Sequence, residues 1–260
     1  MIKRYDSTGR WLPILIAIFG FACGELAWGI NGYAAPELNN SRTLSDIYQQ
    51  AATSPIRTNE DKRADASRKP VELLQFAQVR PGMQVLDLAT DNGYTTQLIA
   101  LAVGSTGTVW AQEVLQRPAF IKRLADHPQS NIVPVIRPFE DPIPIDAPKL
   151  DLITNIMNYH NSTYMSAARR ARLNQRLFKA LKSGGHLIVI DHSSKTGTDI
   201  ATAKRLRRID HAIVLNEIQN AGFRLEQESN FLRNPSDPRN QTYFDMDIPT
   251  DKFAFRFVKP

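Results

Sequence analysis

The stretch Gln84–Thr95, QVLDLATDNGYT, decides the fold of this chain of 260 residues. It begins with a short apolar run that contains one carboxylate, Asp87, and continues into a polar turn, Thr90–Gly93. Tyr94–Val103 then places apolar residues at helical spacing. This order of strand, tight turn and helix is typical of the opening unit of a nucleotide-binding α/β sheet, whose turn passes close under the ligand. The first N–H groups of the helix are free to bind a ligand, so we expect a binding site at this turn.

Strands and helices alternate along the rest of the chain. Further strands are expected at Thr108–Val114, Asn131–Ile136, Leu150–Met157, His186–Ile190, Arg224–Leu232 and Phe253–Val258. Helices are expected at Ser41–Ala52, from Pro70 onward, and at Pro118–Leu124, Met165–Leu181 and Ile200–Ala221. Such alternation implies a mainly parallel sheet with helices on both faces, and the last two strands, which no helix joins, imply an antiparallel edge. The sequence therefore predicts an α/β fold with a doubly wound, Rossmann-like sheet of seven mostly parallel strands.

The composition, with 42% hydrophobic and 22% charged residues, is that of a globular protein with a substantial core. The net charge of +6 is spread along the chain, with denser arginine patches at 169–176 and 205–208. Neither patch is interleaved with aromatic residues, so we interpret both as solvated helix faces. No nucleic-acid partner is therefore expected.

The first 35 residues have a pattern of their own. Basic residues precede an apolar run, Trp11–Cys23, and small residues follow before Pro36. This pattern is typical of a secretory signal peptide, and it predicts a periplasmic or secreted domain of residues 36–260. The alternative is an N-terminal membrane anchor, although the run of 13 residues is shorter than the roughly 20 that span a bilayer. The only cysteine, Cys23, lies in this segment, so no disulfide or cysteine-based metal site is expected in the domain.

Removal of the signal peptide can be tested directly. Protein isolated from its native host is expected to begin near Ala35 or Pro36 when its N-terminus is sequenced. An intact Met1 on membrane-bound protein would instead establish anchoring. After cleavage we expect no stable membrane association, whereas the sequence leaves the oligomeric state open.

The turn after the first strand resembles motif I of class I S-adenosylmethionine (SAM)-dependent methyltransferases. In that motif an acidic residue ends the strand and a Gly-x-Gly-x-Gly turn follows. Asp87 and Gly93 match, while the first two glycine positions hold Ala89 and Asp91. Glycine is used where the backbone needs a positive φ or where a Cβ would meet the ligand, so Asp91 is the larger departure. The resemblance implies that these four residues line the SAM site.

Two later positions extend this resemblance. Glu113 ends the second strand, where a carboxylate accepts hydrogen bonds from ribose hydroxyls; the alternative is an ordinary surface glutamate. Phe139 follows the third strand, where the resemblance places the adenine, so it either covers the adenine face or lies in the core. The segment 181–185, LKSGG, is similar to the family's Leu-Lys-Pro-Gly-Gly turn before the fifth strand and serves as a marker of the fold.

Polar residues follow two other strands, as NYHN at 158–161 and as Asp191-His192-Ser193. Both groups fall at the carboxyl ends of predicted strands, which is the edge of an α/β sheet where ligands bind. His160 and His192, with Asp191, are therefore expected to converge on one pocket. A histidine there can act as a general base toward a hydroxyl, thiol or amine. The alternative is a pair of loop histidines with local hydrogen bonds, and the spacing fits no metal motif, so no metal site is predicted.

The segment Asn234–Thr250 is long for a loop in a compact domain and rich in proline, asparagine and aspartate. Loops of this kind are often lids or binding elements. We expect it to fold back toward the edge of the sheet that carries His160 and His192.

Several segments, in order along residues 58–260, resemble a group of bacterial predicted methyltransferases made with signal peptides: RKPVELLQFAQVRPGM, NYHN, VIDHS, LRNPSD and FVKP. The resemblance implies SAM as cofactor and methyl transfer to an unidentified small-molecule acceptor outside the cytoplasm. Asp87, Gly93 and Glu113 would hold the cofactor, and His160 or His192 would take the proton. The alternative is a degenerate binding protein on the same fold, without SAM turnover, since a fold does not fix a function.

Overall fold

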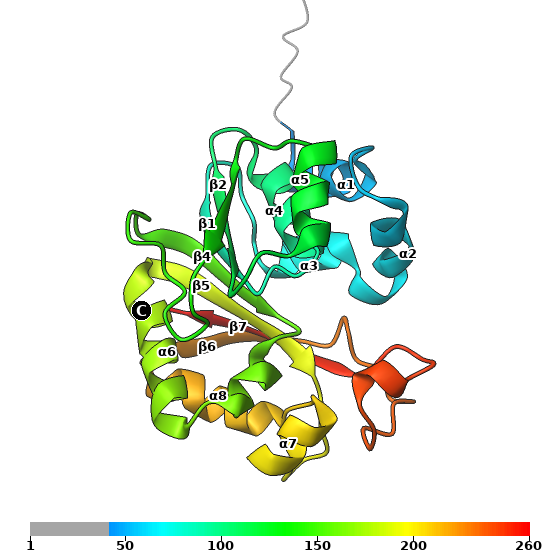
Figure 1. The fold of residues 1–260 in the computed structure, drawn as a ribbon, viewed down its shortest axis with the longest axis vertical. Helices are drawn as coiled ribbons and strands as arrows, with labels where there is room; N and C mark the ends of the chain where they lie inside the picture. The colour runs from blue at the N-terminus through cyan, green and yellow to red at the C-terminus, as the bar shows by residue number, and fades with distance from the viewer. Residues whose placement is uncertain (1–41) are drawn as a thin grey trace, which may run out of the picture. The chain divides into compact units, whose positions relative to one another are not determined.

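The computed structural model of the protein describes residues 42–260 (Figure 1), so the predicted signal peptide lies outside the described residues. The strands are β1 (Gln84–Leu88), β2 (Thr108–Glu113), β3 (Ile132–Ile136), β4 (Leu150–Ile156), β5 (Leu181–His192), β6 (Arg224–Ser229) and β7 (Lys252–Val258). The α-helices are α1 (Leu44–Thr53), α2 (Asn59–Arg68), α3 (Pro70–Phe76), α4 (Tyr94–Val103), α5 (Pro118–Asp126), α6 (Ala167–Ala180), α7 (Ile200–Leu206) and α8 (His211–Asn220). Two short 3-10 helices are η1 (Tyr159–Tyr164) and η2 (Tyr243–Asp245). Within this described range, no helix is both long and apolar enough to cross a membrane.

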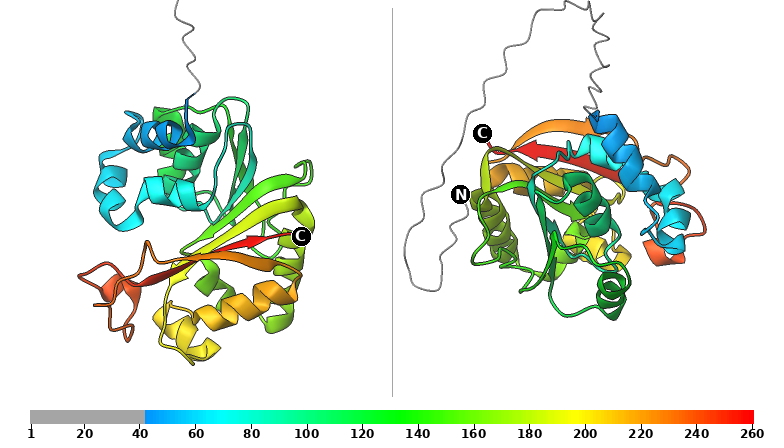
Figure 2. Two further views of the ribbon diagram at one scale, coloured as in Figure 1. Left: turned by 180° about the vertical axis from the view of Figure 1, so that it is seen from behind. Right: turned by 90° about the horizontal axis from the view of Figure 1, so that it is seen from above.

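The strands form one seven-stranded sheet in the order β3-β2-β1-β4-β5-β7-β6. The first five strands in this order, from β3 through β2, β1 and β4 to β5, pair in parallel. Strand β7 runs antiparallel to both of its neighbours, β5 and β6. Helices α1, α3, α4 and α5 lie on one face of the sheet and α6, α7 and α8 on the other (Figures 1 and 2). The predicted α/β fold with an antiparallel edge is therefore confirmed. The strand order reverses between β1 and β4, and ligands of such sheets bind beside this switch point.

The side chains of β1 point alternately to the two faces of the sheet. Val85 packs in the core cluster under α3 and α4, whereas Leu86 and Leu88 pack in the cluster under α6 and α8. Because side chains alternate along a strand, Asp87 lies on the same face as Val85, where α4 begins. Thr96 of α4 donates a hydrogen bond to its carboxylate. The strand and the helix are thus joined directly beside the turn.

The predicted single helix at 200–221 is in fact two helices, α7 and α8. Arg207 has a left-handed φ of 53° and ends α7. Ile209 then forms an isolated β-bridge, which requires extended backbone. Asp210 caps α8, its carboxylate accepting a hydrogen bond from the N–H of Ala212 at 2.9 Å. Aspartate is a strong N-cap, a start signal that the continuous apolar pattern of this segment concealed.

The segment Lys182–Gly185 was predicted to be a turn between a helix and a strand, but it lies inside β5. Leu181 pairs with Leu150, and the next pair along the two strands is Leu152 with His186. The segment is therefore a bulge within the strand. Helix α6 still ends immediately before it, so only the assignment of the glycines to a separate turn was wrong.

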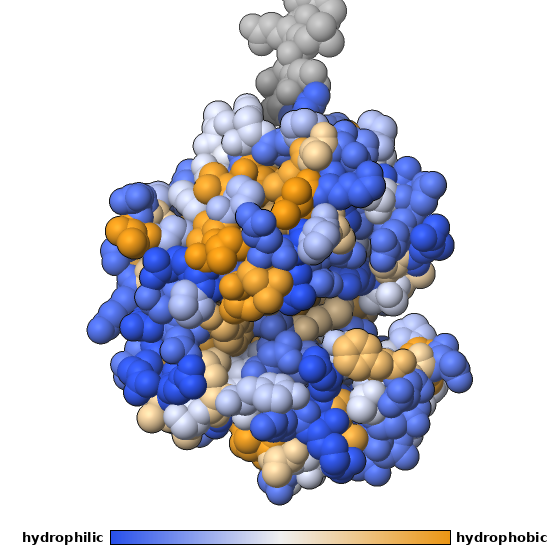
Figure 3. Space-filling model, viewed as in Figure 1, coloured by the Kyte–Doolittle hydropathy of each residue, from blue (hydrophilic) through white to orange (hydrophobic). Residues whose placement is uncertain are grey.

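Apolar side chains gather on the face of the molecule that carries β2 and β3 (Figure 3). Val114, Val133, Ile136 and Ile145 are exposed there. The chain from β3 to β4 is a loop rather than a helix. This end of the sheet therefore lacks the cover that a crossover helix gives to a parallel pair of strands.

Replacing Gly93 by alanine is expected to lower the free energy of unfolding by about 2 to 4 kcal/mol. Gly93 has a φ of 86°, and a Cβ added to it would lie 2.6 Å from the ring of Phe120. The alanine would therefore destabilise the protein in two ways, through the strain of its left-handed backbone and through the clash of its Cβ with Phe120. Chemical denaturation measures the loss, and Gly197→Ala is the matched control, since Gly197 has a φ of 81° with nothing within 4 Å of the added Cβ. An equal loss in both variants would contradict the overpacking at Gly93.

Candidate functional site

A pocket of about 630 Å³ lies at the carboxyl ends of the parallel strands. Its walls come from the turn after β1, the ends of β2, β4 and β5, the end of α2 and the loop that leads into β7. The pocket therefore lies at the switch point between β1 and β4, as expected for an open α/β sheet. Its volume falls within the range of small-molecule and cofactor sites.

The turn under this pocket is left-handed at all three positions where motif I has glycine. The φ values are 52° at Ala89, 53° at Asp91 and 86° at Gly93. The turn is tied to the neighbouring strand, because the N–H of Thr90 donates to the carbonyl of Gln112 at 3.2 Å. The backbone therefore keeps the conformation that glycine would allow. Ala89 and Asp91, which replace glycine there, bear the strain of a left-handed backbone with a Cβ.

Asp87 is buried at the end of β1 and lines the pocket. Its two carboxylate oxygens accept hydrogen bonds from the hydroxyls of Thr96 and Thr154, each at 2.6 Å. Burial raises the pKa of Asp87 to about 6, although these hydrogen bonds oppose the shift. The carboxylate is therefore ionised at neutral pH and places a negative charge in the pocket wall.

Glu113 is buried at the end of β2 and lines the same pocket. Its Oε1 accepts a hydrogen bond from the N–H of Asp91 at 2.7 Å, which fixes both the carboxylate and the turn. Its Oε2 lies 3.4 Å from Nε of Arg117. Since each carboxylate oxygen has two lone pairs, Glu113 retains acceptor capacity for ligand hydroxyls.

The structure brings together His160, Asp191 and His192. The carboxylate of Asp191 accepts the N–H groups of both histidines, at 2.6 Å from His160 and 2.7 Å from His192, and its Oδ1 lies 2.8 Å from Nδ1 of His160. Although burial opposes it, the charge and hydrogen bonds of His160 hold the pKa of Asp191 below its usual value. The two imidazole centroids are 5.9 Å apart. Nε2 of His160 is buried and has no hydrogen-bond partner within residues 42–260.

The two histidines differ in their access to the pocket. His192 lines the pocket, whereas His160 lies behind it, with Tyr243 in contact with both. The ring of Tyr243 stacks on His192 at a centroid distance of 4.2 Å and meets His160 edge-on at 5.7 Å. Burial, together with the nearby charge of Lys252, lowers the pKa of His192 to about 3 even though Asp191 opposes the shift. His192 is therefore neutral at physiological pH and a weak base.

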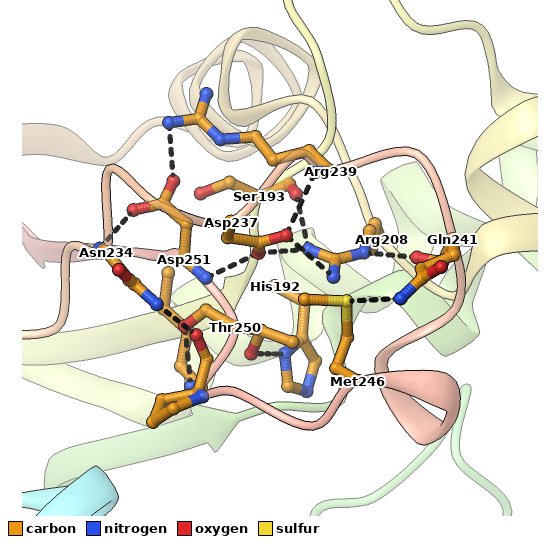
Figure 4. A network of polar contacts seen from close by, with 12 residues as sticks. His192, Ser193, Arg208, Asn234, Asp237, Arg239, Gln241, Met246, Thr250 and Asp251 are labelled. Atoms are coloured by element: carbon orange, nitrogen blue, oxygen red, sulfur yellow. Dashed lines mark hydrogen bonds and ion pairs between the residues drawn. The ribbon is translucent and has the colours of Figure 1, made fainter.

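Tyr243 belongs to the loop 234–250, which folds back to the histidines as predicted. Thr250 at its end places Oγ1 2.7 Å from Nδ1 of His192. The base of the loop is held by a buried ion pair, in which Asp237 accepts from Nη1 of Arg208 at 2.7 Å (Figure 4). These contacts place the loop as one wall of the pocket.

The interpretation of 205–208 as a solvated face was wrong in part. The side chain of Arg208 is fully buried, and Arg207 lines the pocket. In the other arginine patch, Arg170 is also buried and pairs with Glu217 at 2.7 Å. Charge density along the sequence did not distinguish these arginines from their exposed neighbours, because burial depends on the partner that each one meets.

Phe139 is not brought to the pocket. It packs instead against the core cluster on the face of α6 and α8. Phe139 is partly buried there and does not line the pocket, as the second of the two alternatives predicts. Among residues 42–260, no group of three or more histidine, cysteine, aspartate or glutamate side chains is arranged to hold a metal ion.

Known proteins similar in sequence include ubiquinone/menaquinone biosynthesis C-methyltransferases UbiE. That of Laribacter hongkongensis is 29% identical over 120 residues, which cover 46% of this chain and 47% of the relative. That of Burkholderia cenocepacia is 28% identical over 165 residues, which cover 62% of this chain and 65% of the relative. The chain thus spans between 47% and 65% of the length of these two relatives. No family model matches the sequence.

Solved structures share the fold at low sequence identity. A SAM-dependent methyltransferase from Aquifex aeolicus has a TM-score of 0.57 at 16% identity, covering 84% of this chain and 100% of that chain. The N-methyltransferase NodS from Bradyrhizobium japonicum has a TM-score of 0.53 at 14% identity, covering 78% of this chain and 98% of that chain. At these identities the likeness is one of fold.

Proposed function

We propose that this chain, which has the class I SAM-dependent methyltransferase fold and sequence similarity to that family, binds SAM and methylates a small acceptor. The observation that carries the proposal is the turn at 89–93. It keeps a left-handed backbone at every glycine position of the motif, two of which hold other residues. Left-handed geometry outside glycine is costly and is retained mainly at sites where it has a role.

The residues around the turn fit the parts of SAM. The carboxylate of Glu113 is fixed by the N–H of Asp91 and keeps lone pairs for the two ribose hydroxyls. The turn itself, with the start of α4, passes under the methionine part. When bound, SAM supplies a methyl group on a positively charged sulfur, and the negative charge of Asp87 lies in the pocket wall.

The acceptor would lie against the loop 234–250 and the histidines. Asp191 fixes His160 through its Nδ1 and leaves Nε2 without a hydrogen-bond partner among residues 42–260, so Nε2 is the atom placed to receive a proton. The ring of Tyr243 meets that of His160 edge-on at 5.7 Å, and His160 itself does not line the pocket, so the loop would have to move for an acceptor to reach it. Because methyl transfer is a direct displacement, most of the acceleration would come from holding sulfur, methyl group and acceptor in line.

Calorimetry with SAM and S-adenosylhomocysteine tests the proposal. Both are expected to bind at pH 7, and SAM more weakly at pH 5. The reason is the raised pKa of Asp87, about 6: below it the carboxylate becomes protonated and loses its attraction for the sulfonium. No binding of either compound at pH 7 would favour the alternative, a methyltransferase fold that does not turn over SAM.

Replacing Asp91 by glycine is expected to tighten SAM binding by about 1 to 3 kcal/mol, the scale of relieving a steric or unpaired-charge penalty. Asp91 lines the pocket and has a φ of 53°. In the proposed complex its Cβ and charge would lie beside the methionine part of SAM. Calorimetry on the two proteins measures the change. Asp91→Asn is the matched control, because it removes the charge and keeps the Cβ. Tight binding by the parent with a loss in Asp91→Gly would mean that Asp91 is a working ligand contact.

We place the reaction outside the cytoplasm, on the basis of the predicted signal peptide. The supporting observation is the sequence pattern before residue 36, a basic start followed by a short apolar run. Sequencing the N-terminus of the native protein, as described above, tests this part of the proposal independently of SAM binding.

A further inference from the structure

The pocket carries three cations that the binding of SAM, as proposed above, does not use. Arg68 ends α2, Arg207 follows α7 and Lys252 begins β7, and all three line the pocket. Within residues 42–260, none of the three has an acidic side chain within ion-pair distance. Arg117, by contrast, lies 3.4 Å from Glu113. The pocket lining therefore holds three cations in addition to its carboxylates, and the charge of Arg68 acts on both Lys252 and Asp87.

Lys252 is the most deeply buried of these cations. Its side chain lines the pocket, and its Nζ donates to the carbonyl of Thr250 at 3.0 Å. Burial and repulsion by Arg68 lower the pKa of Lys252 to about 8, with further repulsion from Arg208 and with opposing attraction from Asp237 and Asp251. The ammonium is therefore charged at neutral pH. A buried charge is costly unless an opposite charge meets it, and two of its three N–H groups remain for such a partner.

The two arginines are held by aromatic rings instead of carboxylates. The guanidinium of Arg68 lies 4.6 Å from the ring centroid of Tyr94, and that of Arg207 lies 5.4 Å from that of Phe244. A cation–π contact of this kind leaves the N–H groups of Arg68 free for an oxygen anion, whereas Arg207 also hydrogen-bonds the side chain of Tyr243. Phe244 and Ile248 are also exposed apolar residues of the pocket lining. Apolar side chains therefore line the same pocket as the cations, and Arg207 contacts one of them.

We propose that the acceptor is a small organic acid with an apolar body, whose carboxylate binds Lys252 with support from Arg68. Its apolar part would lie against Phe244 and Ile248 of the loop. This inference rests on the proposed function, since it names the class of acceptor for the same pocket. SAM also carries a carboxylate, on its methionine part, so the test separates the two sources.

The test uses the full chain and the probe pair benzoate and benzamide, which have the same ring and differ in charge. NMR or calorimetric titration at pH 7, without SAM, is expected to show benzoate binding at least tenfold more tightly than benzamide. Lys252→Met is expected to abolish this preference, and Arg68→Met to reduce it. Lys149→Met is the matched control, because Lys149 is exposed before β4, at the opposite edge of the sheet, and its loss changes the net charge equally. If Lys252→Met does not fold, the reduced preference of Arg68→Met for benzoate over benzamide is the deciding measurement.

Titrations with SAM and decarboxylated SAM identify the source of the carboxylate. If Lys252→Met binds SAM with an affinity within twofold of the parent, Lys252 does not bind the methionine carboxylate. That result would support the acceptor as the source of the carboxylate. A selective loss of SAM binding in this variant, with decarboxylated SAM unaffected, would assign Lys252 to the methionine carboxylate and overturn the inference. Benzoate preference in a protein that binds no SAM would support the anion site while the proposed methyl transfer failed. Equal binding of benzoate and benzamide by the parent would overturn the inference outright.

Discussion

Replacing Asp237 by alanine is expected to lower the free energy of unfolding by about 3 to 5 kcal/mol, because it leaves the buried guanidinium of Arg208 without its charge partner. Both side chains are fully buried, and the two groups meet at 2.7 Å. Asp237 also accepts the N–H groups of Arg239 and Asp251, at 2.9 Å and 2.6 Å. The substitution would therefore release the base of the loop that carries Tyr243, in addition to unpairing the arginine.

Chemical denaturation at pH 7 measures this loss. The control is Asp126→Ala, which breaks the exposed i,i+4 pair with Lys122 and should cost only about 0.5 kcal/mol. Although burial opposes it, hydrogen bonds from Arg208 and from the backbone hold the pKa of Asp237 below its usual value. The stabilisation is therefore present at neutral pH and is lost as the pH falls through this lowered pKa, so the difference between parent and variant should narrow in acid. If Asp237→Ala lowers the free energy of unfolding by less than about 1 kcal/mol at pH 7, the ion pair of Asp237 with Arg208 does not stabilise the loop.

Replacing Glu113 by alanine is expected to weaken SAM binding by about 3 to 6 kcal/mol, since a hydrogen bond to a charged group contributes about 1.5 to 3 kcal/mol and the ribose offers two hydroxyls. Glu113 is the carboxylate at the end of β2 whose Oε1 is already fixed by the N–H of Asp91. Little reorganisation is therefore needed when the ribose binds.

Calorimetry with SAM compares three variants with the parent. Glu113→Gln keeps an acceptor for the N–H of Asp91 and removes the charge, so it should lose less affinity than Glu113→Ala. Glu72→Ala removes an exposed carboxylate on α3 and should leave the affinity unchanged. Because Glu113 also supports the turn, thermal unfolding of each variant shows whether the fold is retained. Unchanged SAM affinity in a folded Glu113→Ala protein would remove the ribose contact from the proposed function.

Local pattern determined the sheet and the position of its functional edge. The strand–turn–helix unit at 84–103 was identified from a short apolar run followed by helical spacing, and both elements occur as predicted. Parallel strands align their carboxyl ends at one edge of the sheet. Residues at the ends of four different strands were therefore expected to lie together, without knowledge of their contacts. This reasoning brought Asp87 and Glu113 to one pocket and His160 beside His192.

Tertiary structure decided which charged residues are buried and what each one meets. Arg208 and Asp237 are 29 positions apart, and nothing local to either marks the pair. Lys252 and Arg68 share a pocket only because β7 inserts beside β5 and the end of α2 reaches the pocket. The sequence showed that Ala89 and Asp91 replace glycine, but it could not show that the turn stays left-handed. The hydrogen bonds of the turn to the end of β2 hold that conformation, and they exist only once the two strands are paired.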